Sequence, residues 1–306
     1  MLLRKKICKI FLYFTIVLSA VILTSCSSNL IDDINSNLNI PSSQTLNSKD
    51  ILEIQYIDVG QADANLIKLP DSRIIMIDAG GNSSATDLVN NLKSQGIKKI
   101  DYLIATHPHE DHIGGMDNII ENFDIGTFYM PKVDDSQIPT TKTYEDVLTA
   151  VKNKNLKINQ GKADMKIINE TDILFDFIAP NSSYYDGLNS YSIVCRLNYG
   201  NKKFLFMGDA ESDSEKEILN NNFNVKADVL KCGHHGSHSS SSIDFLKACN
   251  PSYAIISCSS DNKYGHPHKK TIDSLNKLNI KTYITANVGT ITIKCDKENI
   301  HIDTEY

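Results

Sequence analysis

The chain has 306 residues, of which 41% are hydrophobic and 22% are charged, and its formal net charge is −6. This composition is typical of a globular protein and supplies enough apolar side chains for a core. The acidic balance argues against a protein that coats nucleic acid over its whole surface, because such proteins are usually basic. It does not exclude a small basic pocket.

The first residues have the pattern of a secretory signal. Residues 1–9, MLLRKKICK, are basic, and the apolar run IFLYFTIVLSAVIL follows them. The run closes on LTSC, where two small residues directly precede Cys26. LTSC resembles a bacterial lipobox, at which cleavage before the cysteine leaves a thiol that carries lipid.

We therefore predict a lipoprotein signal peptide at residues 1–25 and a lipid anchor on Cys26. The alternative is an uncleaved transmembrane helix, because the apolar run approaches the length that spans a bilayer. The small residues before Cys26 favour the lipoprotein. Either outcome places the rest of the chain outside the cytoplasm and attached to the cell membrane.

Residues 26–50 are rich in Ser and Asn without a sustained apolar period, so we predict a flexible tether there. The folded domain is predicted at residues 51–306. It contains five cysteines without a CxxC pair, and this odd number rules out a complete set of disulfides. We expect most of them to be small buried side chains, with one oxidised pair outside the cell as the alternative.

The first half of the domain alternates short apolar segments with segments of helical spacing. Strands are predicted at 52–60, 64–69, 73–80, 101–107 and 127–130, and helices at 84–96, 113–123 and 143–154. The second half begins with strands and then alternates again. Strands are predicted at 165–168, 173–179, 227–232, 253–257 and the C-terminus, a hairpin at 191–211, and helices at 242–249 and 269–279. This pattern predicts a layered α/β protein.

The segment ATHPHEDHIGGM, residues 105–116, concentrates possible metal ligands where a strand ends and a helix begins. His107 and His109 alternate and can share one metal ion, while Asp111 and His112 can turn toward a second one. Imidazole and carboxylate ligands suit Zn²⁺, Mn²⁺ or Fe²⁺. Such a cluster arises by chance in about one chain per thousand or fewer, so we predict metal binding.

The histidine segment resembles the signature of the metallo-β-lactamase fold, a four-layer αββα sandwich. Within that fold the chain is similar to the extracytoplasmic hydrolase domain of the ComEC competence proteins, which serve DNA uptake, and to their stand-alone relatives. The motifs that carry this resemblance occur in order between residues 51 and 300. They are YIDVGQADA, MIDAG, THPHEDHIGG, FLFMGDAE, LKCGHHGSHSSSS and NKYGHPH.

The resemblance implies two divalent metal ions, Zn²⁺ or Mn²⁺, and further ligands for them. Asp209 follows a strand and is expected to bridge both ions, although an Asp that caps the next helix is the alternative. Of the pair His234 and His235, we expect His235 to be the further ligand of the ion held by His107 and His109. We expect His234 to face the substrate. His266 is expected to be the last ligand of the second ion, with a simple contact at a helix N-terminus as the alternative.

Further residues are predicted around this site. Asp78 resembles the acid that orients metal-binding histidines from behind. Residues at another strand end or beside the histidines are expected to line the pocket or to meet the substrate; they are Asp58, Gln61, Asp63, Lys231, Ser237 and His268. One departure from the wider fold is that no histidine occurs between residues 113 and 233. A later histidine must then supply the missing ligand.

The sequence thus predicts a membrane-anchored, extracytoplasmic, metal-dependent hydrolase. Two cations would hold a hydroxide at neutral pH, and the catalytic residues would be Asp111, Asp209 and His234. The expected substrate is a phosphodiester, either nucleic acid or a wall polymer such as teichoic acid. A β-lactamase fits the later motifs poorly, and a non-catalytic metal-binding protein is the remaining alternative.

Overall fold

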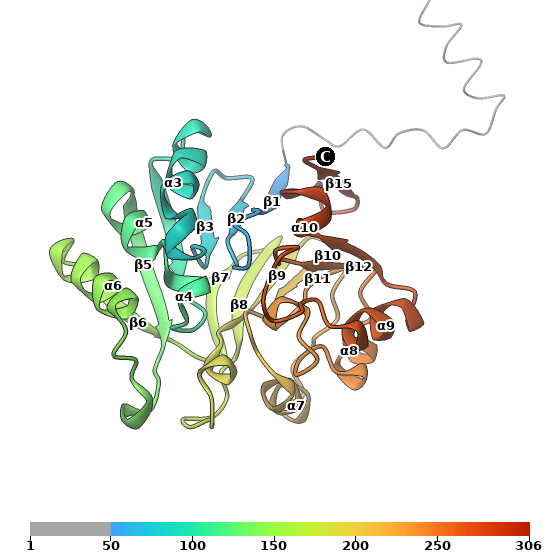
Figure 1. Cartoon of the computed structure of the whole chain (residues 1–306). Coiled ribbons are helices and arrows are strands. Elements are labelled where there is room, and N and C mark those ends of the chain that lie inside the picture. The colour runs from blue at the N-terminus through green and yellow to red at the C-terminus, as the bar shows by residue number, and fades with distance from the viewer. Residues whose placement is uncertain (1–49) are drawn as a thin grey trace, which may run out of the picture. The chain divides into compact units, whose positions relative to one another are not determined.

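Two β-sheets face each other in the computed structural model, which describes residues 50–306 (Figure 1). The predicted signal peptide, Cys26 and almost all of the predicted tether lie outside the described residues. Between residues 50 and 306, no helix has the length and apolar character needed to cross a membrane.

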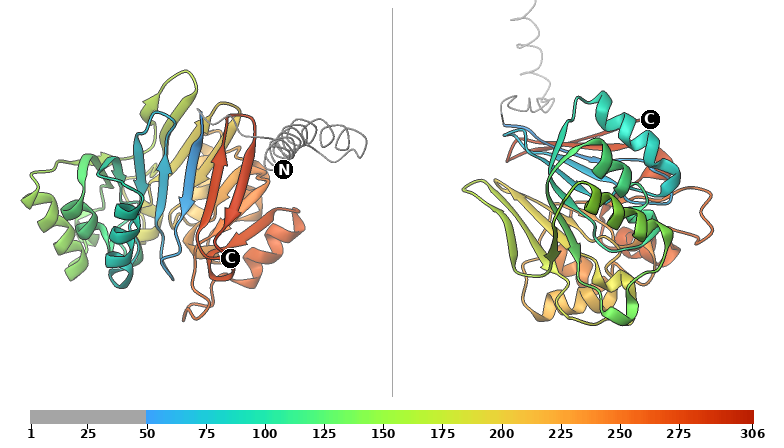
Figure 2. Two further views of the ribbon diagram at one scale, coloured as in Figure 1. Left: turned by 90° about the horizontal axis from the view of Figure 1, so that it is seen from above. Right: turned by 90° about the vertical axis from the view of Figure 1, so that its left-hand side faces the viewer.

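The first sheet has eight strands in the order β15-β14-β1-β2-β3-β4-β5-β6. Their bounds are β1 (Leu52–Tyr56), β2 (Asn65–Lys68), β3 (Ile74–Ile77), β4 (Lys99–Ile104), β5 (Asp124–Pro131), β6 (Ile158–Gly161), β14 (Ile291–Cys295) and β15 (Ile300–Thr304). Strands β3 to β6 run parallel, and the remaining pairs are antiparallel. The last strands of the chain therefore lie beside β1, the first strand of the described residues, as Figure 2 shows from above.

The second sheet has seven strands in the order β13-β12-β11-β10-β9-β8-β7. Their bounds are β7 (Met165–Asn169), β8 (Ile173–Ala179), β9 (Val194–Tyr199), β10 (Lys202–Phe206), β11 (Val229–Lys231), β12 (Tyr253–Ile256) and β13 (Lys281–Ile284). Strands β10 to β13 run parallel. The predicted hairpin joins β9 to β10, and its turn residue Gly200 has φ +54°, a conformation that glycine adopts readily.

The main core lies between the two sheets. In β1 the side chains of Leu52, Ile54 and Tyr56 are fully buried, because alternate residues of a strand point to the same face. They meet aromatic side chains of the second sheet, and the rings of Tyr56 and Phe206 stack with centroids 5.8 Å apart. This apolar layer holds the sheets in one fixed relation, so loops from both can build a common site.

Helices cover the two outer faces. The first sheet packs on α3 (Ala85–Ser94), α5 (Met116–Asn122) and α6 (Lys142–Asn153), and the second packs on α7 (Ser212–Asn220), α8 (Ile243–Cys249) and α9 (Lys269–Lys277). Two single-turn helices, α4 (Glu110–Ile113) and α10 (Thr285–Val288), and four 3₁₀ segments, η1 (Asn82–Ser84), η2 (Asp135–Gln137), η3 (Leu188–Tyr191) and η4 (His234–Gly236), complete the elements of the described residues. The predicted four-layer αββα sandwich is confirmed.

Two details of the predicted elements and cysteines remain. Strand β6 was not predicted, because its sequence INQG lacks apolar alternation; in the structure the strand is largely exposed. The five cysteines of the domain are all buried and free.

Candidate metal centre

The loop after β4 carries the histidine segment. His109 is the N-cap of the single-turn helix α4, and the glycines 114 and 115 follow that turn. A Cβ atom on Gly115 would lie only 2.3 Å from the carbonyl oxygen of Ala79. Glycine therefore lets α4 pack directly against the loop that follows β3, and this brings His112 beside Asp78.

The second sheet supplies the other half of the site. Asp209 lies just after β10, and its backbone N–H donates to the Ser192 hydroxyl at 3.0 Å. The next parallel strand, β11, leads to His234 and His235, which both have φ near +50°. These histidines stand in a left-handed backbone conformation that turns the chain sharply, so their side chains lie beside Asp209.

Four side chains form a first ligand group, called group A: Asp111, His112, Asp209 and His235. The His112 Nε2 atom lies 3.1 Å from Asp209 Oδ1, and His235 Nε2 lies 3.2 Å from Asp111 Oδ2. The buried atoms His112 Nε2, His235 Nε2 and Asp209 Oδ1 lie close together but make no well-formed hydrogen bond. Buried polar atoms normally make one, so three that converge here without it fit a bound cation.

A second group, group B, consists of His107, His109 and Asp209. The His107 Nε2 atom lies 3.0 Å from His109 Nδ1 and 3.7 Å from Asp209 Oδ2. Asp209 thus presents Oδ1 to group A and Oδ2 to group B. This is the position from which one carboxylate can bridge two cations.

Charges in the two groups are strongly coupled. Burial alone would raise the pKa of Asp209, but the nearby His112 and His235 hold that pKa well below its usual range. Burial likewise opposes charge on His112, yet Asp209 and Asp78 raise the pKa of His112 well above the ordinary value. Imidazole must lose its proton to bind a metal ion, so cation binding at group A would release protons.

A network of hydrogen bonds orients the ligands from behind. Asp78 Oδ2 accepts hydrogen bonds from His112 Nδ1 and from the Thr106 hydroxyl, both at 2.8 Å. His235 Nδ1 donates to the carbonyl oxygen of Ser257 at 2.9 Å. With Nδ1 engaged in each case, the Nε2 atoms of His112 and His235 point into group A.

The structure corrects four expectations. Lys231 and Asp63 are both buried outside the cavity lining, and the Lys231 ammonium donates to Asp63 Oδ2 at 2.8 Å, so the two charges balance each other and do not reach a substrate. Asp58 is exposed and lies outside the cavity lining, where its carboxylate accepts from the backbone N–H of Gly60. His235 belongs to group A, although it was expected beside His107 and His109.

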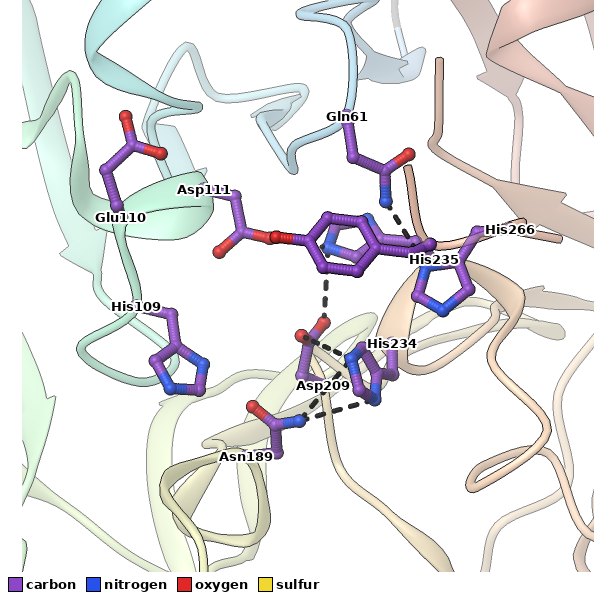
Figure 3. A pocket seen from close by; sticks show the side chains of 10 residues that line it. Gln61, His109, Glu110, Asp111, Asn189, Asp209, His234, His235 and His266 are labelled. Atoms are coloured by element: carbon purple, nitrogen blue, oxygen red, sulfur yellow. Dashed lines mark hydrogen bonds and ion pairs between the residues drawn. The ribbon is translucent and has the colours of Figure 1, made fainter. Parts of the chain in front are cut away.

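A cavity of about 500 Å³ opens over both groups (Figure 3). Its lining consists of Gln61, His109, Glu110, Asp111, Asn189, Asp209, His234, His235, Tyr264 and His266. The histidine His234 is held by Glu211, whose carboxylate lies 3.1 Å from Nδ1, and its Nε2 lies 3.8 Å from Asp209 Oδ2. His234 therefore lines the cavity, and its contact with a substrate stays a prediction.

The remaining predicted residues are distributed around the cavity. His266 Nδ1 lies 3.3 Å from the Gln61 amide nitrogen, and His266 belongs to neither ligand group, so its role as a ligand stays a prediction. Ser237 is buried and bonds to the Ser239 hydroxyl. His268 lies outside the cavity lining, with Nδ1 3.1 Å from the Nδ1 atom of His238.

Sequence reasoning missed three residues of the cavity lining, Glu110, Asn189 and Tyr264, and also Glu211, which holds His234. Glu110, Glu211 and Tyr264 lie within the motifs THPHEDHIGG, FLFMGDAE and NKYGHPH, so their neighbourhood was indicated but their roles were not. Asn189 comes from a loop without any recognisable pattern, and its amide approaches His234. No sequence signal pointed to Asn189, because it meets His234 only through a tertiary contact between residues 45 positions apart.

Residues 57–260 match the family described as the metallo-beta-lactamase superfamily. The chain belongs to this superfamily. Among solved structures it resembles Igni18, a metallo hydrolase from the archaeon Ignicoccus hospitalis, with a TM-score of 0.51 and 15% identity over 79% of this chain and 98% of that one. At this identity the likeness shows a shared fold. Membership in the superfamily and the two ligand groups together support a metal-dependent hydrolase.

Competence proteins are homologues of the chain. ComE operon protein 3 of Bacillus subtilis is 31% identical over 78% of this chain and 32% of its own length. Recombination protein 2 of Haemophilus influenzae is 27% identical over 83% of this chain and 30% of its own length. The chain therefore spans about a third of the length of these relatives. The predicted relationship to competence proteins is confirmed.

Proposed function

We propose that the protein is a phosphodiesterase that hydrolyses nucleic acid with two divalent cations, Zn²⁺ or Mn²⁺. The observation that carries this proposal is the position of Asp209, which offers one oxygen to group A and the other to group B. A carboxylate shared by two ligand groups is suited to holding two cations close together, as in a two-metal hydrolase. Competence proteins among the homologues favour nucleic acid over other phosphodiesters.

Groups A and B would hold the two cations, which when bound supply Lewis acidity and lower the pKa of a coordinated water. The chain's own residues hold and orient the reactants. Asp111 of group A and His109 of group B also form part of the cavity wall. His234 faces the cavity with Nε2, and Glu211 fixes its ring through Nδ1, so His234 is placed to hydrogen-bond a phosphate oxygen.

The test compares three substrates on the purified full-length chain, loaded with Mn²⁺ or Zn²⁺ and then treated with a chelator. Single-stranded DNA should be cleaved, and the chelator should stop the reaction. Cleavage of a glycerol-phosphate wall polymer but not of DNA would reassign the substrate to teichoic acid. Hydrolysis of a chromogenic cephalosporin alone would make the protein a lactamase, and metal binding without any hydrolysis would make it a binding protein.

The location of the enzyme is part of the proposal. We propose that it is a lipoprotein anchored outside the cytoplasm through Cys26, because two small residues precede this cysteine after a basic and apolar leader. Cys26→Ala should abolish labelling of the protein by a radioactive fatty acid in cells. Equal labelling of the wild type and the variant would contradict the lipid anchor.

A further inference from the structure

Large apolar side chains that remain exposed on a folded surface are candidates for contact with a ligand. Within residues 50–306 these side chains are Ile138, Leu148, Ile158, Tyr184, Tyr264 and Tyr306. Among them, only Tyr264 lines the cavity over the metal groups. Its side chain is 53% exposed, so folding leaves about half of this ring in water at the mouth of the cavity.

The ring of Tyr264 has defined neighbours. It stacks on the His266 ring with centroids 5.6 Å apart and an angle of 23° between the planes. The ammonium of the exposed Lys263 lies 5.2 Å from the Tyr264 ring centroid. An exposed aromatic ring beside a lysine is the combination with which proteins hold single-stranded nucleic acid, because bases stack while the cation attracts phosphate.

The loop that carries Tyr264 is held in place although the ring is exposed. The side-chain amide of Asn262 donates to the carbonyl oxygens of Ser259 and His266, both at 2.6 Å. Its carbonyl oxygen accepts from the backbone N–H groups of Tyr264 and His266 at 3.1 and 2.9 Å. A ring on a fixed backbone loses little conformational entropy when it binds, and this favours its use as a contact surface.

We propose that Tyr264 is a platform on which a nucleobase next to the scissile phosphodiester stacks. The proposal rests on the proposed phosphodiesterase function and adds a specificity-determining residue to it. A planar base can cover the exposed part of the ring while the adjoining phosphate enters the cavity beside it. A glycerol-phosphate polymer has no ring to stack, so Tyr264 would favour nucleic acid over such polymers.

The test uses two esters with the same leaving group, thymidine 5′-(p-nitrophenyl phosphate) and methyl p-nitrophenyl phosphate. They differ only in the nucleoside, so the ratio of their KM values isolates base recognition. The wild-type chain should show a KM about 10-fold lower for the thymidine ester. Tyr264→Leu should remove this preference, whereas Tyr264→Phe, which keeps the ring, should retain it.

Tyr184→Leu is the matched control, because Tyr184 is also 53% exposed and does not line the cavity. It should leave the KM ratio unchanged. If Tyr264→Leu keeps the wild-type KM ratio, or if the wild type has equal KM values for both esters, the role of Tyr264 as a platform is wrong. Either result leaves the proposed phosphodiesterase function standing. Hydrolysis of neither ester by the metal-loaded chain would overturn the proposed function, so the two failures are distinguishable.

Discussion

The two halves of the molecule place an aspartate at the same topological position and use it differently. In the first sheet Asp78 follows β3, the first strand of the parallel run, and the next strand β4 leads to His107. In the second sheet Asp209 follows β10, also the first strand of a parallel run, and the next strand β11 leads to His234. Both aspartates are buried where the parallel strands end.

The difference lies in their hydrogen bonds. The two oxygens of Asp78 accept from the backbone and hydroxyl of Thr106 and from His112, so each oxygen has a hydrogen-bond partner. Asp209 Oδ1 has no hydrogen-bond partner. One half therefore supplies an acid that orients a histidine, and the other half supplies an acid that remains available for cations. A shared position in the fold does not determine a shared role; the donors around each carboxylate do.

The largest expected effect comes from Asp209→Asn. The amide keeps the shape but loses the charge that both ligand groups share, so bound metal should fall from two equivalents to less than one. Hydrolysis should fall about a thousand-fold, the upper range for removing one key electrostatic contact. Metal analysis after dialysis, together with the rate on single-stranded DNA, checks this. Asp213→Asn is the control, because that side chain is 78% exposed.

The second prediction concerns the last residue of the strand before each histidine loop. In the first half this residue is Ile104, whereas in the second half it is Lys231, whose ammonium pairs with Asp63. Lys231→Met would leave the buried Asp63 with only the His235 ring beside it, and should lower the free energy of unfolding by about 3–5 kcal/mol. Denaturant unfolding measures this loss.

The double variant Lys231→Met with Asp63→Asn removes both charges and should recover part of the lost stability. Equal stability of the single and double variants would show that the lysine contributes through packing alone. In that case Lys231 would contribute to stability in the same way as Ile104, the residue at the corresponding position of the first half.

The sequence predicts the site best where its residues are close along the chain. Because His107, His109, Asp111 and His112 fall within six consecutive residues, their spacing alone suggested two ligand pairs, and in the structure the two pairs belong to separate groups. The sequence could not reveal that Lys231 is an interior residue, since its partner Asp63 is 168 positions away. The fold followed from motif order, but the exposed edge strand β6 carried no apolar signal.

Asp78→Asn should have a smaller effect than Asp209→Asn. An amide oxygen can still accept from Thr106 or His112 but no longer attracts the His112 ring as a charge does, so the ring is less well oriented. Loss of such a supporting carboxylate typically lowers metal affinity 10- to 100-fold. Because His112 belongs to group A, titration with a chelator should remove one equivalent early and leave the other. Loss of both metals together would show that Asp78 acts like Asp209.

The smallest expected effect tests the contact that joins the halves. The Ser192 hydroxyl accepts from the Asp209 backbone N–H at 3.0 Å and lies 3.3 Å from His107 Nδ1. Ser192→Ala leaves the buried N–H of Asp209 without this partner, so stability should fall by about 1–2 kcal/mol, while both cations still bind. Ser94→Ala is the control, since this exposed serine bonds only within α3. Unchanged unfolding of Ser192→Ala would show that the two halves align Asp209 and His107 without the hydroxyl.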